Sequence, residues 1–303
     1  MRHHPPDLEA AIDDAPDDAS RYAVLGDLYQ QLGDPRGELI SLQLASASAG
    51  RKEREEALIK VLAVPMTRAQ WRWGFVHALT FELVHHVAWE ERRDDWTTSL
   101  LQPALEHPSC RFLRELVVDA SPGDDTLRFL ATHALRHLDG LTMICNELDL
   151  AHLRLPRLQK LQLSAQLIVP AALSLPRLDE LSLPIEAMTI GALGKVLESL
   201  PSLRRLTLSS LEAIDGQALF PVTRVQALES LTLRAEQTTL SAVEAIAQSP
   251  LRESLRTLDV SRSGMTEEAA HRLLALAPKF ARLDSLPLGE MVSLSPPGGT
   301  GGG

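Results

Sequence analysis

Residues 138–148 have the sequence Leu138-Asp139-Gly140-Leu141-Thr142-Met143-Ile144-Cys145-Asn146-Glu147-Leu148. They match the pattern Leu-x-x-Leu-x-Leu-x-x-Asn-x-Leu at every fixed position, with Met143 in place of the third leucine. The first half of this pattern recurs along the chain, and such self-similarity is the signature of a repeat architecture. The central leucines of the copies are Leu116, Leu141, Leu161, Leu181, Leu206, Leu231, Leu258 and Leu286.

The copies follow one another at distances of 25, 20, 20, 25, 25, 27 and 28 residues. Leucine-rich repeats have periods of about 20 to 29 residues, so the chain resembles a leucine-rich-repeat protein. The resemblance implies an α/β fold in the form of a solenoid, with parallel strands on the concave face and helices, 3-10 or extended segments on the convex face. Because the function of a solenoid depends on its surface residues, the repeat predicts an architecture and names no ligand.

Each copy also predicts which strand residues are buried. Side chains alternate along a strand, so positions four and six of the pattern point inward, and positions three, five and seven point outward. A spacing of 20 residues leaves too little chain for a return helix, whereas spacings of 25 to 28 residues have room for one, for example over residues 266–276. Pro287 cannot donate to a strand ladder, so a strand over residues 286–288 is expected at the edge of the sheet.

The N-terminal residues 7–62 predict a small helical domain. One apolar stripe follows helical spacing and consists of Tyr22, Leu25, Leu28, Tyr29 and Leu32. Gly33 is expected to end that helix, and Asp34-Pro35 to begin the next. After a break at residues 48–50, residues 51–62 predict a third helix.

The segment Gly33-Asp34-Pro35-Arg36-Gly37 lies within a longer run, residues 26–43, that resembles the bacterial repeat-companion domain of the myxobacterial type. Proteins of that family place a short helical module before leucine-rich repeats. This chain departs from the usual family pattern at Gly26 and Tyr29. The resemblance implies an architecture and little mechanism.

The expected organisation therefore has four parts. Residues 1–62 form the helical repeat-companion domain, and residues 63–112 form a linker and an N-terminal capping coil. Residues 113–291 form a leucine-rich-repeat solenoid of about eight copies, and residues 292–303 form a disordered Gly/Pro tail. Within the capping coil, Val76, Leu79 and Phe81 take the leucine positions of a first strand, and residues 93–106 predict its return helix.

Composition narrows the classes of function. The net charge of -10 argues against a general affinity for nucleic acid, which needs a basic face. The start of the chain lacks the apolar run of a secretory signal, and no stretch approaches the roughly 18 apolar residues of a membrane span. Cys110 and Cys145 imply no disulfide framework. A cytoplasmic protein is expected, with no membrane partner.

Sequence motifs of catalysis are missing. The chain has no G-x-S-x-G elbow, no H-E-x-x-H pair and no P-loop. His133 and His137 have a spacing that can hold a metal, and His77 with His85-His86 forms a second cluster, but neither has cysteine ligands or an obvious carboxylate partner. We therefore predict no enzyme, no metal and no cofactor.

What remains is a binding surface, so we expect a non-catalytic interaction module or scaffold that binds a partner protein. The alternative is an activator or inhibitor of a partner enzyme such as a GTPase, kinase or nuclease. The candidate partner-binding residues are Lys160, Glu180, Arg205, Arg234, Asp259 and Arg262. The three arginines are expected to form one basic patch for an acidic partner segment. Alternatively, Asp259 and nearby glutamates neutralise them within the sheet. Other candidate anchors are Trp71, Trp73, Trp89 and Trp96.

Overall fold

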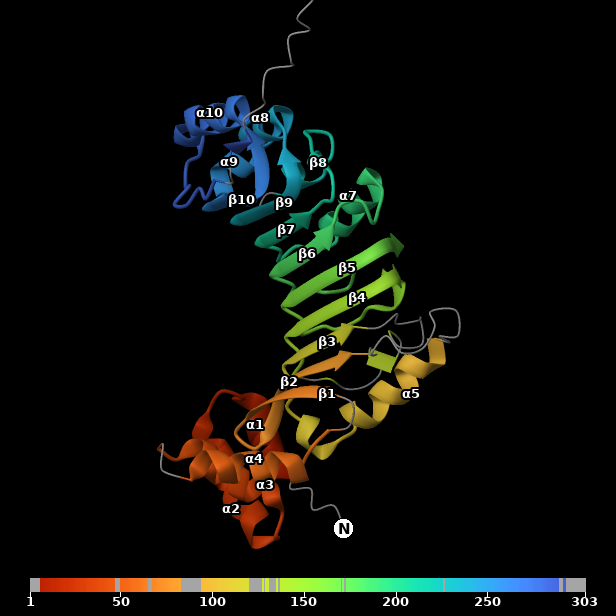
Figure 1. The fold of residues 1–303 in the computed structure, drawn as a ribbon, viewed down its shortest axis with the longest axis vertical. Coiled ribbons are helices and arrows are strands. Elements are labelled where there is room, and N and C mark those ends of the chain that lie inside the picture. The colour runs from red at the N-terminus through yellow and green to blue at the C-terminus, as the bar shows by residue number, and fades with distance from the viewer. Residues whose placement is uncertain are drawn as a thin grey trace, which may run out of the picture. The chain divides into compact units, whose positions relative to one another are not determined.

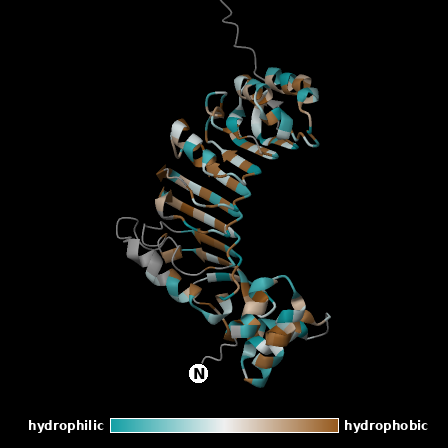
Figure 2. Cartoon of the chain, turned by 180° about the vertical axis from the view of Figure 1, so that it is seen from behind, coloured by the Kyte–Doolittle hydropathy of each residue, from teal (hydrophilic) through white to brown (hydrophobic). Residues whose placement is uncertain are grey.

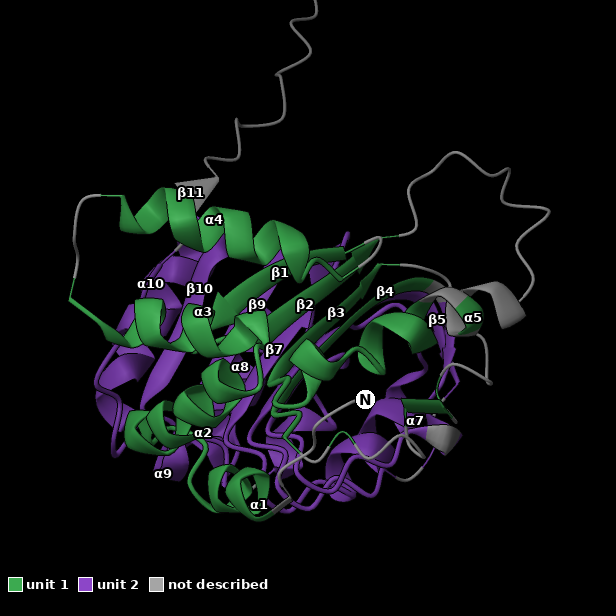
Figure 3. Cartoon of the chain, turned by 90° about the horizontal axis from the view of Figure 1, so that it is seen from below, with its two compact units in different colours: residues 1–145 green, residues 146–303 purple. Residues whose placement is uncertain are grey.

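The computed structural model describes residues 6–46, 50–64, 67–82, 94–119, 127, 129–130, 135, 137–169, 171, 173–225, 227–288 and 291–292. It is an α/β protein whose strands pair mostly in parallel (Figure 1). The chain divides into two compact units, Met1–Cys145 and Asn146–Gly303 (Figure 3). Each unit is described by itself.

The first unit begins with the helices α1 (Pro6–Asp14), α2 (Ala19–Gln31), α3 (Pro35–Leu44) and α4 (Arg51–Val61). The break between α1 and α2 was not predicted. It arises at residues 15–18, where the Asp18 carboxylate caps α2 by accepting a hydrogen bond from the Ser20 backbone N–H at 3.0 Å. The predicted junction between α2 and α3 is confirmed. Gly33 has a φ of 70° there, Asp34 caps α3, and Pro35 is the first residue of that helix.

The predicted stripe on α2 is confirmed for three of its five residues. Tyr22, Leu25 and Tyr29 are buried and pack with Ile12, Ile40 and Phe75 in the core of this unit. Leu28 is half-buried, and the inclusion of Leu32 is wrong because its side chain is 38% exposed. Leu32 is the C-cap residue of α2, so it lies where the chain leaves the helix and its packed face.

A hairpin follows the helices, with strands β1 (Thr67–Arg72) and β2 (Phe75–Glu82). The sequence analysis missed β1, which carries no leucine pattern and pairs antiparallel with β2. Trp73 and Gly74 form the turn with φ of 52° and 77°, the positive values that a two-residue hairpin turn requires. A Cβ on Gly74 would lie only 2.3 Å from Ile40 Cγ1, so the hairpin tip packs closely against α3.

The predicted first strand of the repeat pattern is confirmed as β2. It pairs in parallel with β3 (Glu115–Asp119), with Leu79 opposite Leu116 and Phe81 opposite Val118. The expected return helix is α5 (Asp94–Leu105), and it is followed by the 3-10 segment η2 (Pro108–Cys110). β3 then pairs in parallel with β4 (Gly140–Asp149), with Leu116 opposite Leu141.

The second unit contains the strands β5 (Lys160–Val169), β6 (Glu180–Pro184), β7 (Arg205–Ser209), β9 (Ser230–Thr238) and β10 (Thr257–Thr266), paired in parallel in that order. The central leucines of the copies lie opposite one another, from Leu161 through Leu181, Leu206 and Leu231 to Leu258. Leu181 and Leu183 are fully buried, whereas Ser182 between them is partly exposed. Figure 2 shows hydrophobic and hydrophilic residues alternating along the strands. The predicted alternation is confirmed.

The returns between strands follow the predicted dependence on length, with one exception. The short return after β4 contains the 3-10 segment η3 (Leu150–His152). Longer returns contain α7 (Ile190–Glu198), α8 (Leu240–Gln248) with α9 (Leu251–Ser254), and α10 (Glu267–Leu276), which η5 (Ala277–Lys279) extends. The return between β7 and β9 has room for a helix but forms β8 (Ala213–Ile214) and η4 (Val222–Arg224). Gly216 and Pro221 lie in this return, and both residues disfavour a continuous helix.

The prediction of a strand over residues 286–288 is wrong. Ser285 forms an isolated bridge with Thr257, and the Pro287 carbonyl accepts a hydrogen bond from the Val260 N–H at 3.0 Å. Pro287 has no N–H with which to continue the ladder. The strand beside β10 is instead β11 (Met291–Val292). Apart from Val292, the expected tail 292–303 lies outside the described residues.

Candidate functional site

The six residues predicted to bind a partner all lie on strands of the second unit. Lys160, Glu180 and Arg205 are the first residues of β5, β6 and β7, and they lie opposite one another in the sheet. Arg234 lies on β9, and Asp259 and Arg262 lie on β10. The structure therefore separates these residues into two groups along the strands.

The first group forms a ladder of opposite charges. Lys160 Nζ lies 3.1 Å from Glu180 Oε1. Arg205 Nη2 lies 2.6 Å from Asp179 Oδ2 and 3.6 Å from Glu180 Oε2. Both cations are more than half exposed, so each ion pair contributes about 0 to 1 kcal/mol. The charges of this group are nevertheless already matched within the sheet.

The second group contains two arginines side by side. Arg234 and Arg262 are opposite residues of β9 and β10, and both are exposed. An irregularity in the pairing between Asp259 and Arg262 brings them level with each other. Neither arginine makes an ion pair with a carboxylate in the part of the chain that the structure describes. Two positive charges directly opposite each other on neighbouring strands destabilise the pairing.

Two sequence expectations about this patch change with the structure. Arg205 lies opposite Ser230, whereas Arg234 lies opposite Ser209. The two arginines are thus four residues apart along the strands, about 13 Å, so the three arginines do not form one patch. Asp259 does not neutralise the pair, because its Oδ1 accepts a hydrogen bond from the Ser261 backbone N–H at 2.9 Å and it lies opposite Thr232.

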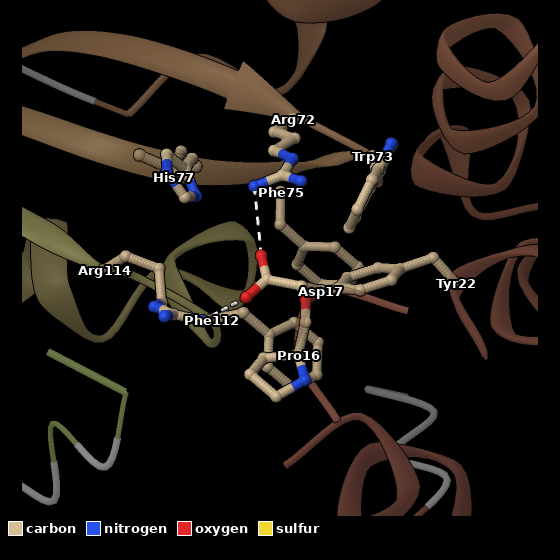
Figure 4. Close-up of a pocket in the computed structure, with 10 residues that line it drawn as sticks. Pro16, Asp17, Tyr22, Arg72, Trp73, Phe75, His77, Phe112 and Arg114 are labelled. Carbon is tan, nitrogen blue, oxygen red and sulfur yellow. Dashed lines mark hydrogen bonds and ion pairs between the residues drawn. The ribbon is translucent and has the colours of Figure 1, made fainter. Parts of the chain in front are cut away.

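The first unit contains a recess that the sequence analysis did not find. Its floor is aromatic and its sides carry charged groups, as Figure 4 shows. The aromatic residues are Tyr22, Trp73, Phe75 and Phe112, and the polar ones include Asp17, Arg72, His77 and Arg114. They come from the α1–α2 turn, α2, the β1–β2 hairpin and the segment before β3. No local sequence pattern joins these segments, although five of the eight residues are aromatic or histidine in a chain that is 4% aromatic.

Asp17 bridges the two arginines of the recess. Its Oδ1 accepts a hydrogen bond from Arg72 Nη1 at 3.2 Å, and its Oδ2 lies 3.8 Å from Arg114 Nη1. Arg114 also binds Asp139. The Arg72 guanidinium lies 4.0 Å from the centre of the Trp73 ring, a cation–π contact that orients it. Trp73 in turn packs against Tyr22, with ring centres 4.9 Å apart.

Burial shifts two pKa values in the recess. Burial raises the pKa of Tyr22 to about 12, so its hydroxyl stays protonated, and this hydroxyl donates a hydrogen bond to the Pro16 carbonyl at 3.1 Å. Burial, and then the positive charge of Arg72, lower the pKa of His77. His77 is therefore neutral at pH 7, and the two guanidinium groups carry the positive charge of the recess.

The other candidate groups do not assemble into a reactive site. Burial raises the pKa of Cys110 to about 12 and that of Cys145 to about 11, which disfavours the reactive thiolate. His137 Nε2 lies 2.7 Å from Asp13 Oδ1, and the predicted metal partners His85, His86 and His133 lie outside the described residues. Within the described ranges, no group of three or more His, Cys, Asp or Glu side chains is arranged to hold a metal ion.

The tryptophan anchors are only partly described. Trp71 packs against Leu39 and Leu58 beneath α3 and α4, and Trp73 lines the recess. Trp89 and the side chain of Trp96 lie outside the described part of the chain. Among the described helices, none has the length and apolar character needed to cross a membrane.

No protein-family model matches the sequence, and no curated protein matches it either.

Proposed function

We propose that the chain is a leucine-rich-repeat solenoid, preceded by a helical module of the repeat-companion type. The regular opposition of Leu161, Leu181, Leu206, Leu231 and Leu258 supports this proposal. So do the returns, which are short or helical according to the length of each copy. In such a fold the outward positions of the strands form one continuous surface on which a partner can bind.

The proposed function is non-catalytic binding of a partner protein in the cytoplasm through the outward face of the strands. The observation that carries it is the Arg234–Arg262 pair. These two guanidinium groups lie level with each other without a carboxylate, in a chain of net charge -10. Their repulsion costs stability and brings the isolated fold no benefit, which favours a role in binding. Arginine binds carboxylates through several donors, so an acidic segment of the partner is the expected counterpart.

The test compares two double variants that remove the same charge. Arg234→Gln with Arg262→Gln removes the unmatched pair, whereas Lys160→Gln with Arg205→Gln removes two cations that already bind Glu180 and Asp179. A partner is first captured on the wild-type chain from an extract of the cells that produce it, and is then purified. Its dissociation constant is measured for each variant by calorimetry at two salt concentrations.

We expect the first variant to weaken binding about tenfold or more and to reduce its salt dependence, because rim and interface charges act electrostatically. The second variant is expected to bind like the wild type. Equal affinities of the two variants would rule out the Arg234–Arg262 pair as the contact. If the purified partner is an enzyme, a change in its turnover on binding would identify this chain as a regulator instead of a scaffold.

A further inference from the structure

The recess of the first unit has the composition of an anion site. Two guanidinium groups, those of Arg72 and Arg114, face it, together with the neutral imidazole of His77 (Figure 4). Asp17 supplies the carboxylate among its lining residues. The aromatic floor keeps water away from one side of these charges, which strengthens electrostatic interactions within the recess.

The carboxylate of Asp17 already shows how an anion lies there. One of its oxygens faces Arg72 at 3.2 Å and the other faces Arg114 at 3.8 Å. Arg72 is held in position from below by the Trp73 ring, at 4.0 Å from the ring centre. The recess is therefore organised around a single carboxylate group, with one cation for each oxygen.

Asp17 is held only weakly. Its side chain is 66% exposed, and that of Arg72 is 42% exposed. Ion pairs between exposed groups contribute little because water solvates both partners well. Asp17 belongs to the short turn between α1 and α2, so its carboxylate can leave the recess by side-chain rotation. Displacement by another carboxylate exchanges equivalent interactions at small cost.

The size of the recess limits the ligand. Its free volume of about 10 Å³ is room for about one water molecule. No small organic molecule fits beside Asp17. A ligand must take the position of the Asp17 carboxylate, and a group of the same size and charge does so without moving the aromatic floor.

We propose that this recess is a carboxylate-binding site for an acidic segment of a partner protein, and that Asp17 occupies it until a partner carboxylate displaces it. The proposal is independent of the Arg234–Arg262 pair, which lies in the other unit. The competing explanation is that Asp17 serves only to fasten the α1–α2 turn to the hairpin.

The experiment uses Asp17→Asn, which keeps the shape of the side chain and removes its charge. The control is Asp14→Asn, since Asp14 is an exposed acid at the end of α1 and does not line the recess. The probe is a hexaglutamate peptide, with hexaglutamine as the neutral peptide. Binding is followed in the full chain through the indole N–H resonance of Trp73 in two-dimensional NMR spectra, assigned with Trp73→Phe.

We expect Asp17→Asn to bind hexaglutamate about tenfold more tightly than the wild type, because the internal competitor with its two exposed ion pairs is removed. Asp14→Asn is expected to bind like the wild type, and hexaglutamine is expected to cause no shift. Adding Arg72→Gln to Asp17→Asn is expected to abolish the effect on Trp73.

Other results overturn the proposal. An Asp17→Asn chain that melts at a lower temperature and binds hexaglutamate no better than the wild type would show that Asp17 only fastens the turn. Saturable binding of inorganic phosphate by Asp17→Asn, without binding of hexaglutamate, would replace the carboxylate with a phosphate ligand. A gain in affinity that survives Arg72→Gln would place the peptide elsewhere on the chain.

Discussion

Arg36 binds the carboxylate of Asp34, two residues earlier in the chain, through both its side chain and its backbone. Arg36 Nη2 donates to Asp34 Oδ2 at 2.6 Å and Arg36 Nε donates to Oδ1 at 3.0 Å, while the Arg36 backbone N–H donates to Oδ1 at 2.9 Å. The guanidinium also lies 4.4 Å from the centre of the Tyr29 ring and donates to the Pro108 carbonyl at 3.3 Å. This one side chain therefore joins α2, the cap of α3 and the segment before β3.

Replacement of Arg36 should be costly. Arg36→Ala is expected to lower the free energy of unfolding by about 2 to 4 kcal/mol, because the largely buried Asp34 carboxylate loses its partner. Arg36→Lys should restore only part of this loss, since an ammonium group cannot bind both oxygens in the same plane. Urea unfolding measures both values, and equal stability of Arg36→Lys and the wild type would contradict the role assigned to the guanidinium.

The same pair predicts a dependence on pH. Burial alone would raise the pKa of Asp34, but hydrogen bonds from the side chain and the backbone N–H of Arg36 outweigh it and hold the pKa below its usual value. A carboxylate with a lowered pKa in the folded state stabilises the fold above its unfolded pKa of about 3.9, and this stability is lost as the pH falls through the folded pKa. Asp34→Asn should therefore be less stable than the wild type at pH 7, and the difference should shrink below about pH 4. A difference that stays constant over pH 2 to 7 would contradict the prediction.

Two glycines with positive φ provide a matched comparison. Gly33 and Gly74 have φ of 70° and 77°, but a Cβ on Gly33 meets nothing within 4 Å, whereas on Gly74 it would lie 2.3 Å from Ile40 Cγ1. Gly33→Ala should cost about 1 to 2 kcal/mol for the backbone conformation alone. Gly74→Ala should cost about 3 to 5 kcal/mol, because overpacking against α3 adds to it. Thermal melts compare the two, and similar losses would mean that the hairpin tip does not pack tightly on α3.

The alternation in the second unit can be tested on one strand. Leu181 is fully buried and Ser182 is partly exposed. Leu181→Ala should therefore cost about 2 to 5 kcal/mol, through lost burial and the cavity it leaves. Ser182→Ala should change stability by less than about 0.5 kcal/mol. Chemical denaturation of both variants decides, and a larger effect of Ser182→Ala would reverse the assignment of the two faces.

The unmatched arginines predict a gain in stability from a charge reversal. Arg262→Glu places a carboxylate opposite Arg234 and should raise the free energy of unfolding by about 0.5 kcal/mol. The same reversal at Arg205 places a third acid beside Asp179 and Glu180 and should lower it by a similar amount. Denaturation midpoints at low salt should show the two opposite signs, which high salt should reduce. A loss of stability in both variants would mean that Arg262 has a partner within the fold.

Local sequence was sufficient wherever a neighbouring residue supplies the physical cause. The spacing of leucines predicted which strand residues are buried, since side chains alternate along any strand. Gly33 and Asp34-Pro35 predicted a helix junction because positive φ, capping and a fixed proline φ are properties of those residues themselves. The length of each copy predicted where most return helices form, because a helix needs a minimum length of chain.

Contacts between distant segments were decided only by the tertiary structure. β1 forms because β2 offers it a partner strand, not because of a pattern of its own. Arg234 and Arg262 are 28 residues apart in sequence, and only the pairing of β9 with β10, with its irregularity, places them level while it keeps Arg205 about 13 Å away. The recess gathers Asp17, Arg72 and Arg114 from three segments. Ion pairs and like-charge contacts depend on distances of a few ångströms, and such distances between remote residues are set by packing and register, which residue spacing alone does not contain.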